Sequence, residues 1–73
     1  MPLNPLSYRE VKRKLETAGF VEVSQKGSHV KFAKSTDEGT RTAIVPRYRE
    51  ITIGTLASIL RQAGISADEF GAL

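Results

Sequence analysis

Residues 20–34, with the sequence FVEVSQKGSHVKFAK, predict a β-hairpin, and this hairpin decides the fold. Residues 20–25 alternate in polarity and are rich in β-branched side chains, a pattern typical of a strand. Gly27-Ser28 is a turn sequence, and residues 29–34 predict the returning strand. We therefore expect two antiparallel strands joined by a tight turn.

Side chains alternate between the two faces of a strand, and this alternation predicts which side chains of the second strand share a face. Val30 and Phe32 lie on one face, and His29 and Lys31 lie on the other. If the apolar pair faces the core, then His29 and Lys31 face solvent.

A helix is predicted before the hairpin. Ser7 is the expected N-cap, and Glu10 is expected to reach back to it in a capping box. Apolar side chains recur at helical spacing from Val11 to Ala18, and Gly19 ends the helix. Residues 1–6 contain two prolines and predict an extended lead-in.

The hairpin is followed by a polar loop, expected over residues 35–40, and by a third strand over residues 41–45. Pro46 ends this strand because it cannot donate to the ladder. Residues 47–51 predict a basic connection.

The C-terminal part predicts a second helix, with Thr52 or Thr55 as its cap and Gly64 as its end. A second capping box at residues 66–69 predicts one final short turn, which carries Phe70.

The expected fold class is α+β, with the order helix, three-stranded antiparallel meander, helix, in one domain over residues 1–73. Two helices that cover one face of the sheet leave the opposite face open for a partner. Phe20 is expected to pack at the corner between helix and strand. The other expected core residues are Val11, Leu15, Phe32, Val45, Leu56, Ile59 and Leu60.

The composition excludes several classes of protein. The absence of cysteine excludes disulfides, thiolate metal sites and cysteine nucleophiles. No apolar run approaches the roughly 20 residues that cross a bilayer. The N-terminus lacks the basic and apolar regions of a signal peptide. We expect a soluble cytoplasmic protein that needs no cofactor.

The net charge is +3, and the positive charge is concentrated in the middle of the chain. Six cations and only two carboxylates lie between Ser24 and Arg49. A basic surface there attracts polyphosphates through counterion release. The alternative is a solvated face that only keeps the protein soluble.

His29 is the only histidine, so one chain offers neither a two-histidine acid–base pair nor a histidine-rich zinc site. Asp37-Glu38 and Asp68-Glu69 are adjacent pairs in or beside turns, which we interpret as solvated and not as metal ligands. A Ser28–His29 nucleophile pair is disfavoured, because neighbouring strand residues point to opposite faces and no third group orients the imidazole.

RNA cleavage is a reaction that a lone histidine can catalyse, because RNA supplies its own nucleophile, the 2′-hydroxyl. A histidine side chain ordinarily titrates near neutral pH and can act as general base or acid. Lys26 and Lys31 are candidates to stabilise the charged phosphorane. Lys31, Tyr48 or water can protonate the leaving 5′-oxygen. An idle or structural His29 is the alternative.

Two further features suit a nucleic-acid site. Arg47-Tyr48-Arg49 is a basic–aromatic–basic run that can stack a base and hold its phosphates, although a loop tyrosine can equally be a lid over the core. Gly27 serves the turn geometry, and its missing side chain can also admit a phosphate. The expected RNA-binding residues are Lys26, Gly27, Ser28, Lys31, Arg47, Tyr48 and Arg49.

Three motifs occur in order along residues 7–70. They are Gly27-Ser28-His29-Val30-Lys31-Phe32 after Ala18-Gly19-Phe20, then Val45-Pro46 with Glu50-Ile51, then Gly54-Thr55-Leu56 with Ile59-Leu60-Arg61-Gln62-Ala63-Gly64. With these motifs the chain resembles the HicA family of mRNA interferases, the toxin half of HicA–HicB toxin–antitoxin modules.

The resemblance implies a fold similar to the double-stranded-RNA-binding domain. It also implies that His29, in the Gly-Ser-His motif, is needed to cleave mRNA. A third implication is a HicB-type antitoxin that binds the toxin and masks the face carrying His29. Many relatives have a second histidine shortly after Val-Pro, where this chain has Tyr48 or its neighbours.

Two rival interpretations remain. A module that binds duplex RNA without cutting it has a compatible fold, but such modules use a lysine cluster at the start of their second helix. Residues 52–58 contain no lysine. An inactive toxin relative that acts only through protein contacts is expected to lose the catalytic motif, and Gly27-Ser28-His29 is intact.

Overall fold

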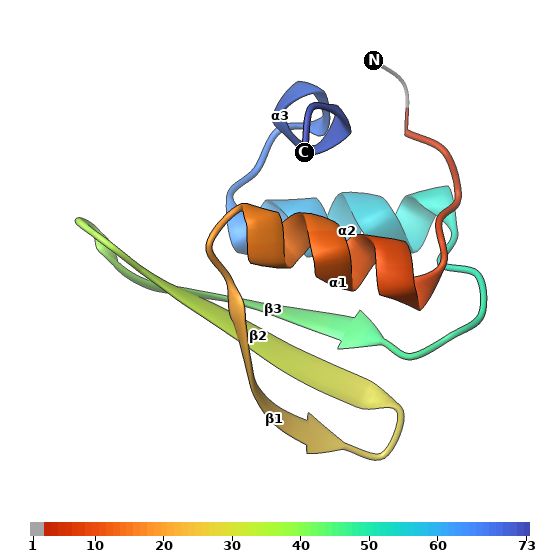
Figure 1. The fold of residues 1–73 in the computed structure, drawn as a ribbon, viewed down its shortest axis with the longest axis horizontal. Helices are drawn as coiled ribbons and strands as arrows, with labels where there is room; N and C mark the ends of the chain where they lie inside the picture. The colour runs from red at the N-terminus through yellow and green to blue at the C-terminus, as the bar shows by residue number, and fades with distance from the viewer. Residues whose placement is uncertain (1–2) are drawn as a thin grey trace.

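The computed structural model describes residues 3–73 of the chain. Its three strands form one antiparallel sheet in the order β1-β2-β3. Helices α1 and α2 lie together on one face of this sheet, and the short α3 lies beyond them (Figure 1). The elements are α1 (Tyr8–Thr17), β1 (Val21–Lys26), β2 (His29–Thr36), β3 (Gly39–Pro46), α2 (Ile53–Ala63) and α3 (Ala67–Gly71). This arrangement confirms the expected α+β fold, and α3 is the expected final turn.

The N-terminal lead-in is tied to the connection that precedes α2. Leu6 and Ile51 exchange two backbone hydrogen bonds, with N···O distances of 3.1 and 2.6 Å. Met1 and Pro2, which belong to the expected lead-in, lie outside the described residues.

The core lies between the sheet and the two long helices. All seven expected core residues and Phe20 are buried, which confirms the interpretation of the apolar pattern. Burial of these side chains is the main favourable term in folding, at about 25 cal/mol per Å² of apolar surface. The core also takes in Val30, Ala43, Ile51, Ala63 and Phe70.

The predicted capping box of α1 is only half formed. The Ser7 hydroxyl accepts a hydrogen bond from the Glu10 backbone N–H at 3.2 Å, as expected. The Glu10 carboxylate does not reach back, because it accepts two hydrogen bonds from Arg13 instead, at 2.9 and 3.2 Å. A bidentate charge-assisted pair is stronger than a bond to one neutral N–H. By contrast, the box at Ser66 and Glu69 is complete in α3.

The prediction of a polar loop over residues 35–40 is wrong. Strand β2 runs to Thr36 and β3 starts at Gly39, so only two residues form the turn. The Thr36 hydroxyl closes this turn, because it donates to the Gly39 carbonyl at 2.6 Å and accepts from the Glu38 N–H at 3.2 Å. The hairpin tip extends beyond the helices into solvent (Figure 1). Its side chains are therefore polar on both faces of the strands, and they show no alternation that would predict strands.

Strand β1 lies one residue later than the strand predicted over residues 20–25, because it spans Val21–Lys26. Every residue of β1 is exposed, and the register shifts between Glu22 and Ser24, which places a bulge at Val23. The strand is held from the helix side by an ion pair of 3.1 Å between Lys12 of α1 and Glu22. It is an edge strand with one neighbour, and a bulge is common at such edges.

Substitutions at two neighbouring residues test the assignment of faces on β2. Phe32 is fully buried and Lys31 is exposed. We expect Phe32→Ala to lower the free energy of unfolding by about 3–5 kcal/mol, through lost burial and the cavity left behind. We expect Lys31→Ala to change it by less than about 0.5 kcal/mol. Urea denaturation followed by circular dichroism measures both, and equal losses would contradict the assignment.

Candidate functional site

The turn before β2 fixes the position of His29. Lys26 pairs with His29 across the β1–β2 ladder, so Gly27 and Ser28 form a two-residue hairpin loop. Gly27 has a positive φ of 59° and Ser28 does not, which is the requirement of a type II′ turn with glycine at its first central position. His29 is therefore the first residue of β2, and its side chain is exposed.

The open face of the sheet gathers three of the expected residues. His29 lies directly opposite Lys26 on β1 and Pro46 on β3. Directly opposite residues of an antiparallel pair have Cβ atoms about 4.5–5.5 Å apart. Lys31 follows two residues later on the same face, opposite Ser24 and Ile44. We call Lys26, His29 and Lys31 the His29 cluster.

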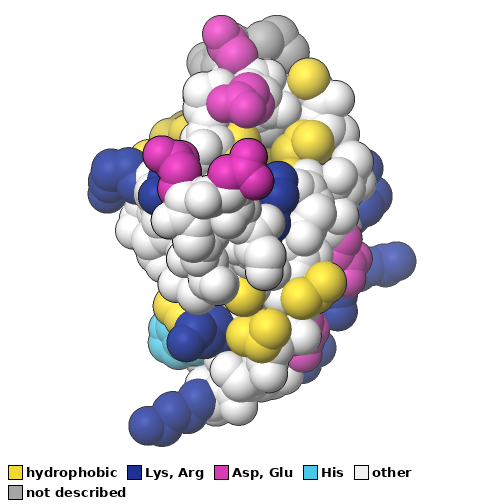
Figure 2. All heavy atoms as spheres, turned by 90° about the vertical axis from the view of Figure 1, so that its left-hand side faces the viewer, with side chains coloured by type: hydrophobic (Ala, Val, Ile, Leu, Met, Phe, Trp, Pro, Cys, Tyr) yellow, Lys and Arg dark blue, Asp and Glu magenta, His cyan; other side chains and the backbone are white. Residues whose placement is uncertain are grey.

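The electrostatics of the His29 cluster are positive. Neither ladder row through the cluster contains a carboxylate, and within residues 3–73 neither lysine forms an ion pair. Figure 2 shows the histidine at the surface, with a basic side chain next to it and exposed hydrophobic side chains nearby. The cluster is thus an exposed cationic surface with one group that can transfer protons.

Arg47 contacts the turn before β2 through both its backbone and its side chain. Its backbone N–H donates to the Ser28 carbonyl at 2.6 Å. Its guanidinium donates to the Gln25 side chain at 3.4 Å, and Gln25 in turn donates to the Gly27 carbonyl at 3.0 Å. The guanidinium carbon also lies 5.3 Å from the centre of the Tyr8 ring of α1. Arg47 therefore reaches toward the helices while His29 faces outward.

The other two residues of the basic–aromatic–basic run lie beyond the end of β3. Tyr48 and Arg49 are exposed in the connection between β3 and α2. In the described part of the chain neither forms a hydrogen bond, ion pair or ring contact. Tyr48 is 51% exposed, so the interpretation of this tyrosine as a lid over the core is wrong.

The comparison with protein families decides which family the chain belongs to. The family model described as "HicA toxin of bacterial toxin-antitoxin" matches residues 8–65, from the start of α1 to just past α2. The chain belongs to the HicA toxin family. No curated protein matches the chain. The match spans the complete sheet and includes the His29 cluster, so this HicA chain carries its cluster on the part of the fold that defines the family.

Metal ions in proteins are held by clusters of side chains, and residues 3–73 contain no such cluster. Among residues 3–73, no three His, Asp or Glu side chains lie close enough to hold an ion together. In the same residues, no helix is long and apolar enough to cross a membrane. One acidic pair lies at the tip of the β2–β3 hairpin, and the other lies in α3.

Sequence reasoning missed two residues around the His29 turn of this HicA toxin. Gln25 bonds both the turn and Arg47, and Tyr8 lies beneath the Arg47 guanidinium. Partial burial raises the pKa of the Tyr8 phenol, as does the nearby Glu22 carboxylate, while Lys12 and Arg47 oppose the shift. The residues between Tyr8 and Arg47 include a helix and three strands, so no local pattern could have paired them.

A substitution at Gly27 tests the geometry of this turn. A Cβ added at Gly27 meets nothing within 4 Å, so any cost comes from the positive φ alone. We expect Gly27→Ala to lower the free energy of unfolding by about 1–2 kcal/mol. Gly54→Ala is the control, since a Cβ there also meets open space but the backbone is helical. Denaturant unfolding that gave equal effects at both glycines would refute the turn geometry.

Proposed function

We propose that this HicA toxin is a metal-independent endoribonuclease that cleaves mRNA, with His29 as its catalytic residue. The observation that carries the proposal is the His29 cluster, a proton-transfer group between two lysines on the open face of the sheet. Such a cluster lacks a nucleophile, and RNA is a substrate that brings its own.

The reaction is internal transesterification. The 2′-oxygen attacks the neighbouring phosphorus, an O2′–P bond forms and the P–O5′ bond breaks. His29 takes the proton from the 2′-hydroxyl as general base, or supplies the proton to the 5′-oxygen as general acid. Lys31 and Lys26 stabilise the negative charge that grows on the phosphorane oxygens, an effect that is often the largest single term in catalysis.

The substrate is single-stranded mRNA and not duplex RNA. Duplex-binding domains of this fold place lysines at the start of the second helix, where they span phosphates across the groove. In this chain the start of α2 is uncharged, and Ile53 there is 48% exposed. An apolar side chain at that position offers neither a charge nor a hydrogen bond to a phosphate of a duplex.

The partner of the toxin is a HicB-type antitoxin that covers the open face of the sheet. This face carries apolar as well as basic side chains. Val21 and Val23 of β1 are 59% and 51% exposed, and Ile44, opposite Lys31, is 39% exposed. A partner with apolar and acidic side chains would bury both kinds of contact and block access to His29. Toxin and mRNA meet in the cytoplasm.

Induction of the toxin in a bacterial host tests the catalytic assignment. We expect growth arrest and loss of intact mRNA with the native chain, and neither with His29→Ala. The variant keeps its fold, because an exposed strand residue contributes little to the core. Circular dichroism and thermal melting of the purified variant serve as the control. Equal toxicity of the two chains would mean that the toxic activity does not require His29. If neither chain is toxic, the result would favour a relative that only binds RNA or is inactive.

A further inference from the structure

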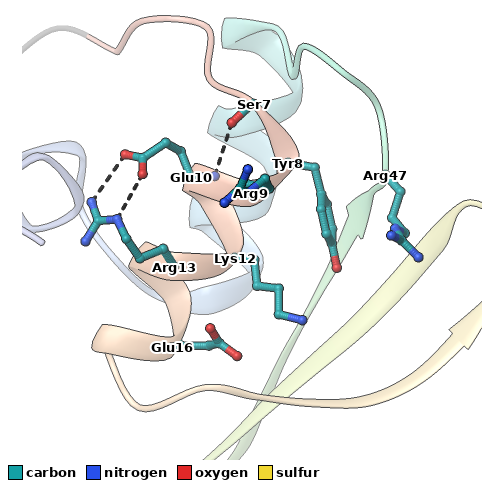
Figure 3. Close-up of a pocket in the computed structure, with 8 residues that line it drawn as sticks. All are labelled: Ser7, Tyr8, Arg9, Glu10, Lys12, Arg13, Glu16 and Arg47. Carbon is teal, nitrogen blue, oxygen red and sulfur yellow. Dashed lines mark hydrogen bonds and ion pairs between the residues drawn. The ribbon is translucent and has the colours of Figure 1, made fainter.

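An open groove of about 630 Å³ lies on the helix side of the sheet, next to the His29 turn. Its walls come from α1 and its N-cap, from Ser7 to Glu16, and from Arg47 (Figure 3). Tyr8, Arg9 and Lys12 line the side formed by the helix. The groove does not contain His29, Lys26 or Lys31, so it is separate from the His29 cluster.

Two of the cations in this groove are available to a ligand. Arg13 is engaged by Glu10 through two hydrogen bonds, and Lys12 is paired with Glu22 at 3.1 Å. Arg9 and Arg47 are exposed, and within residues 3–73 neither forms an ion pair.

The remaining carboxylate of the groove lies at a distance from these two arginines. Figure 3 shows Glu16 two turns further along α1 than Tyr8. The end of the groove nearest the turn is thus positive, and it attracts anions.

Tyr8 and Arg47 give this end of the groove a platform for a base. The guanidinium lies 5.3 Å from the centre of the Tyr8 ring, so the ring holds the arginine in place through a cation–π contact. Unstacked RNA bases stack on aromatic rings and on arginine guanidinium planes. A cation beside a stacking surface is the combination that holds single-stranded nucleic acid.

The groove is connected to the His29 cluster by the turn itself. The Arg47 N–H bonds the Ser28 carbonyl, and Ser28 precedes His29 in the chain. Gly27 leaves open space above the turn. A polyanionic strand that passes from His29 over the turn meets no side chain at Gly27 and then reaches Arg47, which lines the groove.

We propose that this groove is a second RNA subsite, which holds nucleotides next to the scissile phosphate. The proposal rests on the function proposed above. In this subsite Arg9 and Arg47 bind phosphate, and Arg47 supported by Tyr8 stacks a base. Single-stranded RNA is the ligand, because a base inside a duplex has no free face to offer.

The experiment measures RNA binding without cleavage, in a His29→Ala background. A fluorescently labelled single-stranded RNA is titrated at several salt concentrations. We expect Arg9→Ala to weaken binding and to reduce the slope of log affinity against log salt by about 0.7, the value for one phosphate contact on a single strand. We expect Tyr8→Leu to weaken binding about tenfold with little change in slope, because a stacking support is lost and no charge is lost. Tyr8→Phe keeps the ring and should bind like the parent.

The controls separate this proposal from the one it rests on. Arg61→Ala removes another exposed arginine, from α2 and outside the groove, and should leave both affinity and slope unchanged. Lys31→Ala reports on the His29 cluster. If Lys31→Ala weakens binding while Arg9→Ala and Tyr8→Leu behave like Arg61→Ala, then the groove is not an RNA subsite and the proposed function stands. If the parent binds no RNA, both proposals fail.

Discussion

Val30 and Phe32 of β2 have no exposed surface, and their burial against the helices fixes which face of the strand meets solvent. His29 and Lys31 alternate with them and are therefore held outside. A slip of one residue in register would bury both polar side chains and expose both apolar ones, so the register is strongly specified. The two-residue turn at Gly27-Ser28 then places Lys26 opposite His29. The candidate site thus depends on apolar contacts in which none of its own side chains takes part.

Several of the positive charges are engaged in contacts within the fold. Lys14 donates to the carbonyls of Phe70 and Leu73 at 3.0 and 3.2 Å and so fixes α3 to α1. Lys34 lies over the Phe20 ring, and Arg41 lies against Gly64 at the end of α2. These last two cations share a cavity with Glu38 and Glu69, near the hairpin tip. Lys26, Lys31 and Arg47 around the His29 turn, by contrast, are exposed and form no ion pair within residues 3–73.

Much of the fold could be predicted from the sequence, because hydrophobic periodicity and helix capping depend on residues that are close together in the chain. The alternation in residues 29–34 and the helical spacing of Val11 and Leu15 depend on nearest neighbours, and the structure confirms both. The hairpin tip was missed because Thr36 closes its turn with a side-chain hydrogen bond that no polarity pattern reports. Likewise, Glu10 was assigned to Ser7, but a competing arginine one turn away binds it.

The candidate site was predictable only where it is local. Lys26, Gly27, Ser28, His29 and Lys31 lie within six residues of one another, and one hairpin brings them together. The grouping of Arg47, Tyr48 and Arg49 with them was an argument from composition. Of these three residues the structure bonds only Arg47 to the turn, directly through its backbone N–H to Ser28 and indirectly through the Gln25 side chain. Contacts between residues far apart in the chain depend on tertiary packing, and no local pattern in a single sequence predicts them.

The central claim is that the RNA itself supplies the nucleophile, and the chemical ends of the cleaved RNA test it most directly. Purified toxin is incubated with a single-stranded RNA in the presence of EDTA, and the fragments are identified by mass spectrometry. Attack by the 2′-oxygen predicts a 2′,3′-cyclic phosphate, or the monophosphate formed by its hydrolysis, on the upstream fragment and a 5′-hydroxyl on the downstream one. Fragments with a 3′-hydroxyl and a 5′-phosphate would contradict the account, because they require attack by water and not by the 2′-oxygen.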